Sequence, residues 1–209
     1  MATLSDGNFT GVRASLGDWL ARSDLTNTDY GNFIYLFEKE FNTEMRLRGM
    51  EGQTTPGVTS GYIQHPSDFL QWKSLKVVEG GKEYALGALT EENAAYDYGL
   101  SFPDRARGFV IRGDKTYIYP IGATGTYTGV YFQGVPALNA SNTTNWLLTK
   151  YPQLYLYGPL LQAQAYVSNP DKIQLWNIAF EQAKAKVFTE SQRASFGGGL
   201  PTMRPDRFY

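Results

Sequence analysis

A helical stripe runs through Tyr30-Gly-Asn-Phe-Ile-Tyr-Leu-Phe-Glu-Lys-Glu-Phe-Asn-Thr-Glu-Met45. Apolar side chains recur in this stretch every three or four residues, which is the spacing of one face of an α-helix. The pattern therefore predicts a long helix that buries this face in a core. The residues on the stripe are Tyr30, Phe33, Ile34, Phe37, Phe41 and Met45.

A second amphipathic helix is expected just before this one. Its apolar face consists of Val12, Leu16, Trp19 and Leu20, again at helical spacing. The segment from Arg22 to Asp29 is polar and offers several candidate N-cap side chains. Two helices joined by so short a turn should pack as an antiparallel hairpin, which we place over residues 1–50.

The chain from about residue 51 to residue 140 favours β-structure. The stretch from Gly49 to Pro66 is polar and contains several glycines, so we expect a loop there. Two pairs of apolar segments then flank the dipeptides Gly80-Gly81 and Gly113-Asp114, which favour two-residue hairpin turns. The expected strands are 69–78 with 82–86, 109–112 with 116–119, and a further strand at 126–133. Thr90, followed by two glutamates, predicts an N-capped helix that ends at Tyr98.

Helical patterns return in residues 141–195. Pro152 is expected to open a helix that runs to about Val167, with a kink at Pro159. Asn169-Pro170-Asp171 combines an N-cap, a proline at the first helical position and an acid in the first turn, so another helix should start there. Its apolar face, continuing to about Arg193, consists of Ile173, Trp176, Phe180, Ala183 and Val187. The predicted fold class is α+β, a bundle of N- and C-terminal helices with a central inserted antiparallel β region.

The last segment, residues 196–209, is expected to be an extended C-terminal arm. Gly197, Gly198 and Gly199 predict a hinge. Apolar and guanidinium side chains follow the hinge and could anchor the arm on a protein partner, although a disordered tail is the alternative. These candidate anchors are Leu200, Met203, Arg204, Arg207, Phe208 and Tyr209.

Composition narrows the possible functions. The 209 residues include 19 basic and 20 acidic residues, so the chain lacks the basic excess of a dedicated nucleic-acid binder. No apolar run is long enough to cross a membrane, and the N-terminus does not resemble a signal peptide. The chain has no cysteine, which fits assembly in a reducing cytoplasm. Its 15 tyrosines, 12 phenylalanines and 4 tryptophans suit either a protein interface or a glycan-binding surface.

Catalytic and cofactor motifs are not expected. The one histidine, His65, precedes Pro66 in a predicted loop and has no cysteine to partner it, so we interpret it as a loop-packing residue. No glycine-rich phosphate-binding motif occurs. The acidic cluster Glu91-Glu92 with Asp97 is explained by the first turn of a helix. We therefore predict no enzyme activity, no metal site and no cofactor.

Several segments resemble one family, the head-to-tail adaptors of tailed bacteriophages. The resemblance begins with Trp19-Leu-Ala-Arg-Ser-Asp24-Leu25 and Phe33-Ile-Tyr-Leu-Phe-Glu38, and continues through Met45-Arg-Leu-Arg48 and Pro66-Ser-Asp-Phe69. Its most specific part is Thr144-Asn-Trp-Leu-Leu-Thr-Lys-Tyr-Pro-Gln-Leu-Tyr-Leu-Tyr157. The signature residues are Trp19, Asp24, Phe33, Glu38, Asn145, Trp146, Leu147, Tyr151, Pro152 and Tyr155.

The resemblance implies a structural virion protein at the portal vertex, made and assembled in the host bacterial cytoplasm. Such adaptors bind the portal protein as monomers after DNA packaging and form a ring, usually of twelve subunits. Double-stranded DNA passes through the ring without sequence-specific binding, and the next tail or nozzle protein docks on it. The arm at Leu200–Tyr209 is then the candidate portal-binding segment.

Two other functions stay open at this point. A tail protein that binds carbohydrate or a receptor would suit the tyrosine content, and a tail hydrolase is a second alternative.

The aromatic residues on the helical stripes are expected in the core of the bundle, with Tyr155 and Tyr157 bracing it. These core residues are Trp19, Phe33, Phe37, Phe41, Trp146, Trp176 and Phe180.

Overall fold

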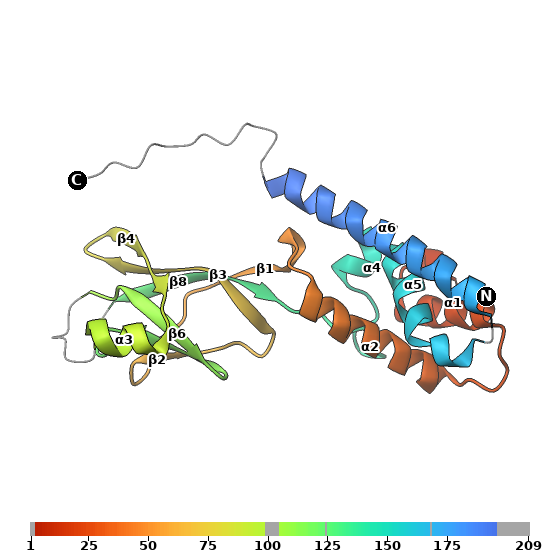
Figure 1. The fold of residues 1–209 in the computed structure, drawn as a ribbon, viewed down its shortest axis with the longest axis horizontal. Coiled ribbons are helices and arrows are strands. Elements are labelled where there is room, and N and C mark those ends of the chain that lie inside the picture. Colours follow the sequence, from red (N-terminus) through yellow and green to blue (C-terminus); the bar gives the residue numbers. More distant parts are fainter. Residues whose placement is uncertain (1–2, 99–104, 124, 168, 196–209) are drawn as a thin grey trace. The chain divides into compact units, whose positions relative to one another are not determined.

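The computed structural model describes residues 3–98, 105–123, 125–167 and 169–195 (Figure 1). The chain divides into two compact units, a helical unit formed by residues 1–49 and 135–209 and a β-rich unit formed by residues 50–134. This arrangement confirms the predicted α+β class, with helices from both ends of the chain and β-structure from its middle.

The helical unit is built around one apolar helix. Its helices are α1 (Phe9–Leu20), α2 (Asn27–Glu44), α4 (Trp146–Lys150), α5 (Pro152–Gln162) and α6 (Pro170–Ser195). Helix α5 packs against each of the other four. Its sequence is apolar nearly all round, with Leu154, Tyr155, Leu156 and Leu160 buried, which is typical of a helix enclosed by others. Gly158 on α5 lies against Phe37, where a Cβ would come within 2.2 Å of the ring.

The two long helices bear out their sequence patterns. All six residues of the predicted stripe are buried in α2 or directly after it. Helix α2 starts at a capping box in which the Thr26 backbone N–H donates to Asp29 at 2.8 Å. Helix α6 starts where Asn169 accepts a hydrogen bond from the backbone N–H of Asp171 at 2.9 Å. Its buried face contains Trp176, Phe180, Ala183 and Val187 as predicted.

Three expectations for the helical unit need correction. Trp19 is 45% exposed rather than buried, because it sits in the last turn of α1, where it packs edge-to-face on Tyr157. Trp146 is half-buried, with its indole over Gly49. The helix opened by Pro152 ends at Gln162, and a tighter 3₁₀ turn, η3 (Gln164–Tyr166), follows it.

The β-rich unit contains two four-stranded sheets. The first has the order β1 (Glu51–Thr54), β8 (Thr126–Gln133), β3 (Phe69–Glu79), β4 (Lys82–Ala85), and all its pairings are antiparallel. The second has the order β2 (Tyr62–Gln64), β7 (Lys115–Tyr119), β6 (Gly108–Arg112), β5 (Gly87–Ala88). Only β5 and β6 pair in parallel among the described strands. Both sheets contribute to one core, which includes Ile63, Trp72, Leu75, Phe109, Ile118 and Tyr127.

Both predicted hairpins are present, and one predicted loop is not. Gly80 and Gly81 have φ angles of 56° and 76°, which suit the turn between β3 and β4. The helix expected after Thr90 is α3 (Glu91–Tyr98). The stretch from Gly49 to Pro66, however, contains strands β1 and β2. Each of them lies at the edge of its sheet, so its polar residues pair on one side only and show no apolar alternation.

Candidate functional site

A buried hydrogen-bonded network joins three of the signature residues inside the helical unit. Glu38 of α2 is only 3% exposed, and its Oε1 accepts from the Tyr155 hydroxyl at 2.8 Å and from the backbone N–H of Leu138 at 3.0 Å. Asn145 donates from Nδ2 to the same Tyr155 oxygen at 2.6 Å and to the carbonyl of Pro136 at 2.8 Å. Residues far apart in the sequence thus meet at one point in the core.

Asn145 also starts the first of two successive helices. Its Oδ1 accepts from the backbone N–H of Leu148 at 2.8 Å, so it is the N-cap of α4 as well as part of the network. Leu147, which follows, is fully buried. Tyr151 ends α4 and precedes α5, where Pro152 occupies the first turn. The signature segment therefore sets the direction of α5 through the bundle.

The network fixes the segment that returns from the β-rich unit to the helices. Leu138 and Pro136 are held as described, and the backbone N–H of Val135 donates to Asn42 Oδ1 at 2.9 Å. Two side chains of α2, one turn apart, therefore bind this segment through its backbone. The sequence predicted Glu38 but not Asn42, because no motif distinguishes this asparagine from an ordinary surface residue of the helix.

Burial dominates the chemistry of Glu38. Desolvation raises the pKa of this carboxyl to about 7, although the hydrogen bonds from Leu138 and Tyr155 act in the opposite direction. The second oxygen, Oε2, is buried and has no hydrogen-bond partner among the described residues. Burial also raises the pKa of the Tyr155 hydroxyl, so it stays protonated and donates to Glu38. The site is suited to holding structure and offers no open face to a substrate.

A second cluster joins the turn between α1 and α2 to η3. Asp24 binds the Arg22 guanidinium through both oxygens, at 2.8 and 2.7 Å, and this pairing lowers the pKa of Asp24. The oriented Arg22 donates from Nη1 to the carbonyl of Tyr166 at 2.8 Å. The Tyr166 ring lies 5.6 Å from that of buried Phe33. Asp24 and Phe33 were predicted as signature residues. Arg22 lies in the same family-like segment, but its contact with Tyr166 was not predicted.

A model of the SU10 adaptor protein family matches residues 8–205. The chain belongs to this family of phage head-to-tail adaptors. The match spans both units and includes every signature residue described above. No curated protein matches the chain. Family membership makes the chain a component of the virion and supports a structural role.

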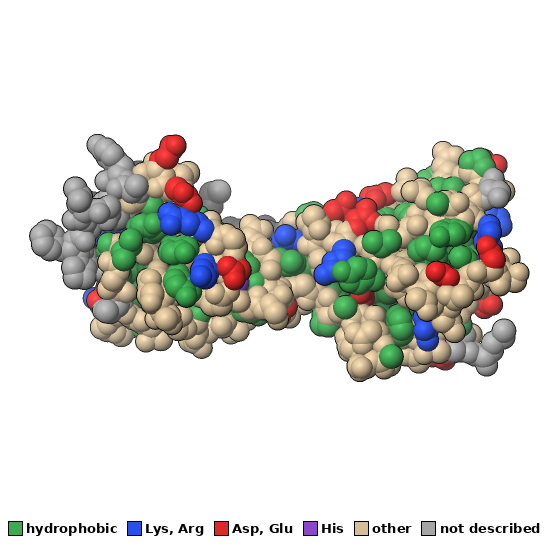
Figure 2. All heavy atoms as spheres, turned by 90° about the horizontal axis from the view of Figure 1, so that it is seen from below, with side chains coloured by type: hydrophobic (Ala, Val, Ile, Leu, Met, Phe, Trp, Pro, Cys, Tyr) green, Lys and Arg blue, Asp and Glu red, His purple; other side chains and the backbone are tan. Residues whose placement is uncertain are grey.

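Large hydrophobic side chains are exposed on both units. Figure 2 shows several hydrophobic patches on the helical unit, each bordered by polar or charged atoms. Contiguous patches of this kind can mark surfaces that bind other proteins, whereas single exposed hydrophobic side chains are common. Those of the helical unit are Trp19, Tyr35, Leu36, Tyr166, Leu175, Ile178 and Phe188, and those of the β-rich unit are Ile111 and Ile121.

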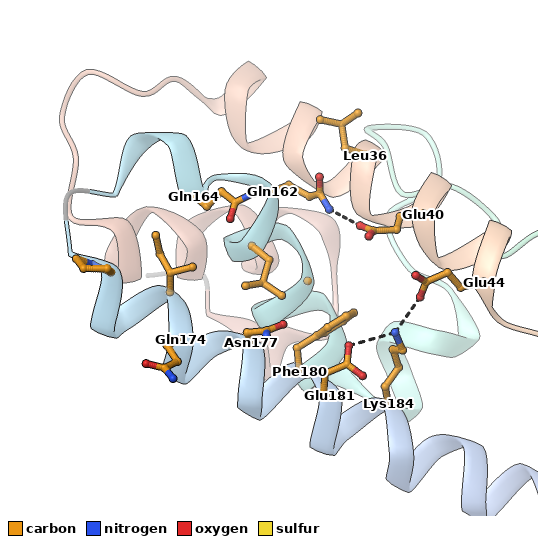
Figure 3. A pocket seen from close by; sticks show the side chains of 14 residues that line it. Leu36, Glu40, Glu44, Gln162, Gln164, Gln174, Asn177, Phe180, Glu181 and Lys184 are labelled. Atoms are coloured by element: carbon orange, nitrogen blue, oxygen red, sulfur yellow. Dashed lines mark hydrogen bonds and ion pairs between the residues drawn. The ribbon is translucent and has the colours of Figure 1, made fainter.

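A groove of about 740 Å³ lies between α2, the end of α5 and α6 (Figure 3). Its apolar lining includes Leu36, Leu161, Ile173 and Phe180. Three carboxylates border it, and Lys184 bridges two of them, at 2.8 Å to Glu44 and at 3.2 Å to Glu181. The third, Glu40, accepts a hydrogen bond from Gln162. Ile173 and Phe180 were predicted on an apolar helix face, but the groove itself was not predicted, because its lining comes from separate elements.

His65 packs in its loop as interpreted from the sequence. Its Nε2 lies 2.7 Å from the Thr116 hydroxyl, its ring stacks on Phe69 at 3.9 Å, and burial lowers its pKa. Arg112 and Asp114, on either side of Gly113 in the second predicted hairpin turn, are both engaged: Arg112 pairs with Glu91 at 2.7 Å, and Asp114 accepts from Gln64 at 2.8 Å. The described residues contain no cluster of three or more potential metal ligands.

Two further findings bear on the predictions. Among the described helices, none is both long and apolar enough to cross a membrane. The predicted hinge, Gly197 to Gly199, and the candidate portal-binding residues lie outside the described residues. These are Leu200, Met203, Arg204, Arg207, Phe208 and Tyr209.

Proposed function

We propose that this adaptor is a ring subunit at the portal vertex, without enzymatic activity, that binds the portal protein after DNA packaging and gives the tail a docking face. The observation that carries the proposal is the family match over residues 8–205, which leaves out only a few residues at each end. The buried network of Glu38, Tyr155 and Asn145 supports it, because these residues brace the bundle rather than form a substrate site.

The ring, proposed to contain twelve copies, requires a heterologous interface in which one face of each subunit meets a different face of its neighbour. Exposed apolar side chains on α2 and α6 are suited to such contacts. A net charge of −1 adds little repulsion between copies and little attraction for DNA. The lumen of the ring would therefore let double-stranded DNA slide through.

Portal attachment is proposed to use the C-terminal arm. Burial of Leu200, Met203, Phe208 and Tyr209 would contribute about 1.5–3 kcal/mol for each side chain. Ordering the arm would oppose this by on the order of 10 kcal/mol, so a single arm binds weakly. Many arms on one ring would bind together, and avidity would then make attachment persistent. Arg204 and Arg207 would add contacts to portal carboxylates.

The decisive experiment mixes the purified protein with a portal ring and determines mass and subunit ratio by native mass spectrometry. We expect a defined number of adaptor copies per portal ring, with twelve on a twelve-fold portal. A protein that leaves the portal unbound but joins tail components or glycans would instead be a tail protein with a receptor- or carbohydrate-binding role. Turnover of cell-wall or glycan substrates would contradict the non-enzymatic role.

A further inference from the structure

The outer side of α6 carries an exposed stripe that no other described element covers. It consists of Leu175, Ile178, Gln182, Lys186, Thr189 and Arg193, spaced by three or four residues, and all six are exposed. Leu175 is 65% exposed and Ile178 is 49% exposed. The Thr189 hydroxyl donates to the carbonyl of Ala185 and needs no outside acceptor. We call these six residues the outer stripe.

The outer stripe combines apolar side chains with two unpaired cations. Lys186 and Arg193 form no ion pair with any described residue. The apolar residues lie at one end of the stripe and the two cations lie towards the other, so its formal charge is +2. A complementary partner surface needs apolar side chains and acidic groups at its border.

The groove between α2, α5 and α6 has these properties. Its lining mixes amide side chains with apolar ones, among them Leu36 and Ile173. Its border carries Glu40, Glu44 and Glu181 against the single cation Lys184 (Figure 3). Three negative charges and one positive charge leave a formal charge of −2, opposite to that of the outer stripe. Figure 3 shows Lys184 held between Glu44 and Glu181, which leaves Glu40 as the carboxylate without a cation.

The two surfaces cannot meet within one chain, because they occupy different sides of the same helix. The α6 residues that line the groove include Ile173, Asn177 and Lys184, whereas the outer stripe contains none of them. A surface and its complement on different sides of one subunit generate a head-to-tail contact between copies, which closes into a ring when the rotation allows it.

We infer that the groove of one adaptor copy receives the outer stripe of α6 from the next copy. This inference rests on the proposed ring and names the two faces that form it. Leu175 and Ile178 of the stripe pack on the apolar side chains of the groove, and Lys186 and Arg193 approach the acidic border. Because the contact pairs two different faces, it propagates beyond a dimer.

Cross-linking with introduced cysteines tests this contact directly, because the natural chain has no cysteine. The variant Leu36→Cys/Leu175→Cys places one thiol at the groove and one on the outer stripe, both at exposed positions. A short bismaleimide should link copies into a ladder of dimers, trimers and larger species. The matched control, Leu36→Cys/Asp18→Cys, should give no ladder, and either single-cysteine variant should stop at dimers at most.

Charge reversal adds a specificity test in the same double-cysteine background. The groove variant Glu40→Lys/Glu181→Lys and the stripe variant Lys186→Glu/Arg193→Glu should each lose the ladder by about tenfold or more, because like charges then face each other. An equimolar mixture of the two should restore it, since each reversed groove then meets a reversed stripe. Ladders that persist in both variants, or a mixture that restores nothing, would overturn the inference.

The experiment is run on the free protein at high concentration and on the protein bound to a portal ring. Adaptor copies that assemble on the portal without groove-to-stripe cross-links would contradict this inference and leave the proposed function standing. If the free protein forms the ladder but does not bind the portal ring, the result would support the contact between these faces and contradict portal binding. If neither a ladder nor portal binding is observed, the result would contradict both this inference and the proposed function.

Discussion

The Tyr155 hydroxyl donates a 2.8 Å hydrogen bond to the buried carboxyl of Glu38, a residue 117 positions earlier in the chain. The contact joins α5 to α2 in the centre of the helical unit. It also links the bundle to the returning segment, because Glu38 accepts from Leu138 as well. Because both partners are buried, the protonation state of Glu38 and the packing of the bundle are coupled.

Stability should therefore fall as pH rises from about 4.5 to about 7. In the folded protein burial raises the pKa of Glu38 from 4.5 to about 7, so the folded state keeps a proton that the unfolded chain has already released. The stabilisation is fully present below the unfolded pKa and is lost as pH rises through the folded pKa, by about 3 kcal/mol in total. Urea unfolding at pH 5 and pH 8 measures the difference.

The variant Glu38→Gln is the control for this pH dependence. Its amide oxygen can still accept from Leu138 and Tyr155, and it does not titrate. The variant should lose most of the difference between pH 5 and pH 8, whereas other titrating groups such as His65 remain the same in both proteins. An unchanged pH dependence in the variant would show that Glu38 does not cause it.

Removal of the Tyr155 hydroxyl should destabilise the helical unit. Tyr155→Phe deprives Glu38 of a donor and Asn145 of an acceptor, so two buried polar groups lose a partner and the free energy of unfolding should drop by about 1–3 kcal/mol. Tyr157→Phe, at a half-buried tyrosine with no hydroxyl bond among the described residues, should change it by less than about 0.5 kcal/mol. Equal effects of the two variants would contradict a special role for the network.

A methyl group at Gly158 should not fit. A Cβ there would lie 2.2 Å from the Phe37 ring inside the core, so Gly158→Ala should destabilise the protein by about 1–3 kcal/mol or more. Gly17→Ala is the matched control, because a Cβ at this helical position meets its nearest atom at 3.6 Å. That change should stabilise α1 by up to about 1 kcal/mol. Thermal unfolding of both variants distinguishes close packing from a general effect of glycine in a helix.

Truncation after Ser195 should separate attachment from folding. We expect the shortened chain to keep its unfolding midpoint and to lose stable portal binding, since the proposed anchors are removed. The full-length variant Arg204→Ala/Arg207→Ala should bind more weakly than the natural chain, with a reduced salt dependence. Unchanged portal binding by the truncated chain would eliminate the arm as the attachment segment.

The sequence patterns predicted best where periodicity reflects burial. The stripe of α2 and the face of α6 follow from the spacing of Phe37 or Trp176, and the hairpins follow from glycine pairs that suit tight turns. Trp19 was predicted wrongly because helical spacing identifies a face but not how far a partner extends along it. Strands β1 and β2 were missed because edge strands need no alternation of apolar residues.

The site was predicted in part. Resemblance to the family pointed to Glu38, Asn145 and Tyr155, and the structure brings these three into contact. Spacing along the chain could not reveal that contact, nor the groove, because both depend on the packing of helices from opposite ends of the sequence. Arg22 and Asn42 bind a backbone carbonyl and a backbone N–H group, and every residue type offers these groups, so the sequence does not reveal the partners.

The chain enters the β-rich unit through β1 and leaves it through β8, and these strands pair antiparallel with Glu51 opposite Phe132. Entry and exit are therefore neighbours, and the returning segment is bound by Asn42 and Glu38 of α2. Because its two ends are adjacent, the inserted β-rich unit can be replaced by another domain without a change in the path of the helical unit's chain.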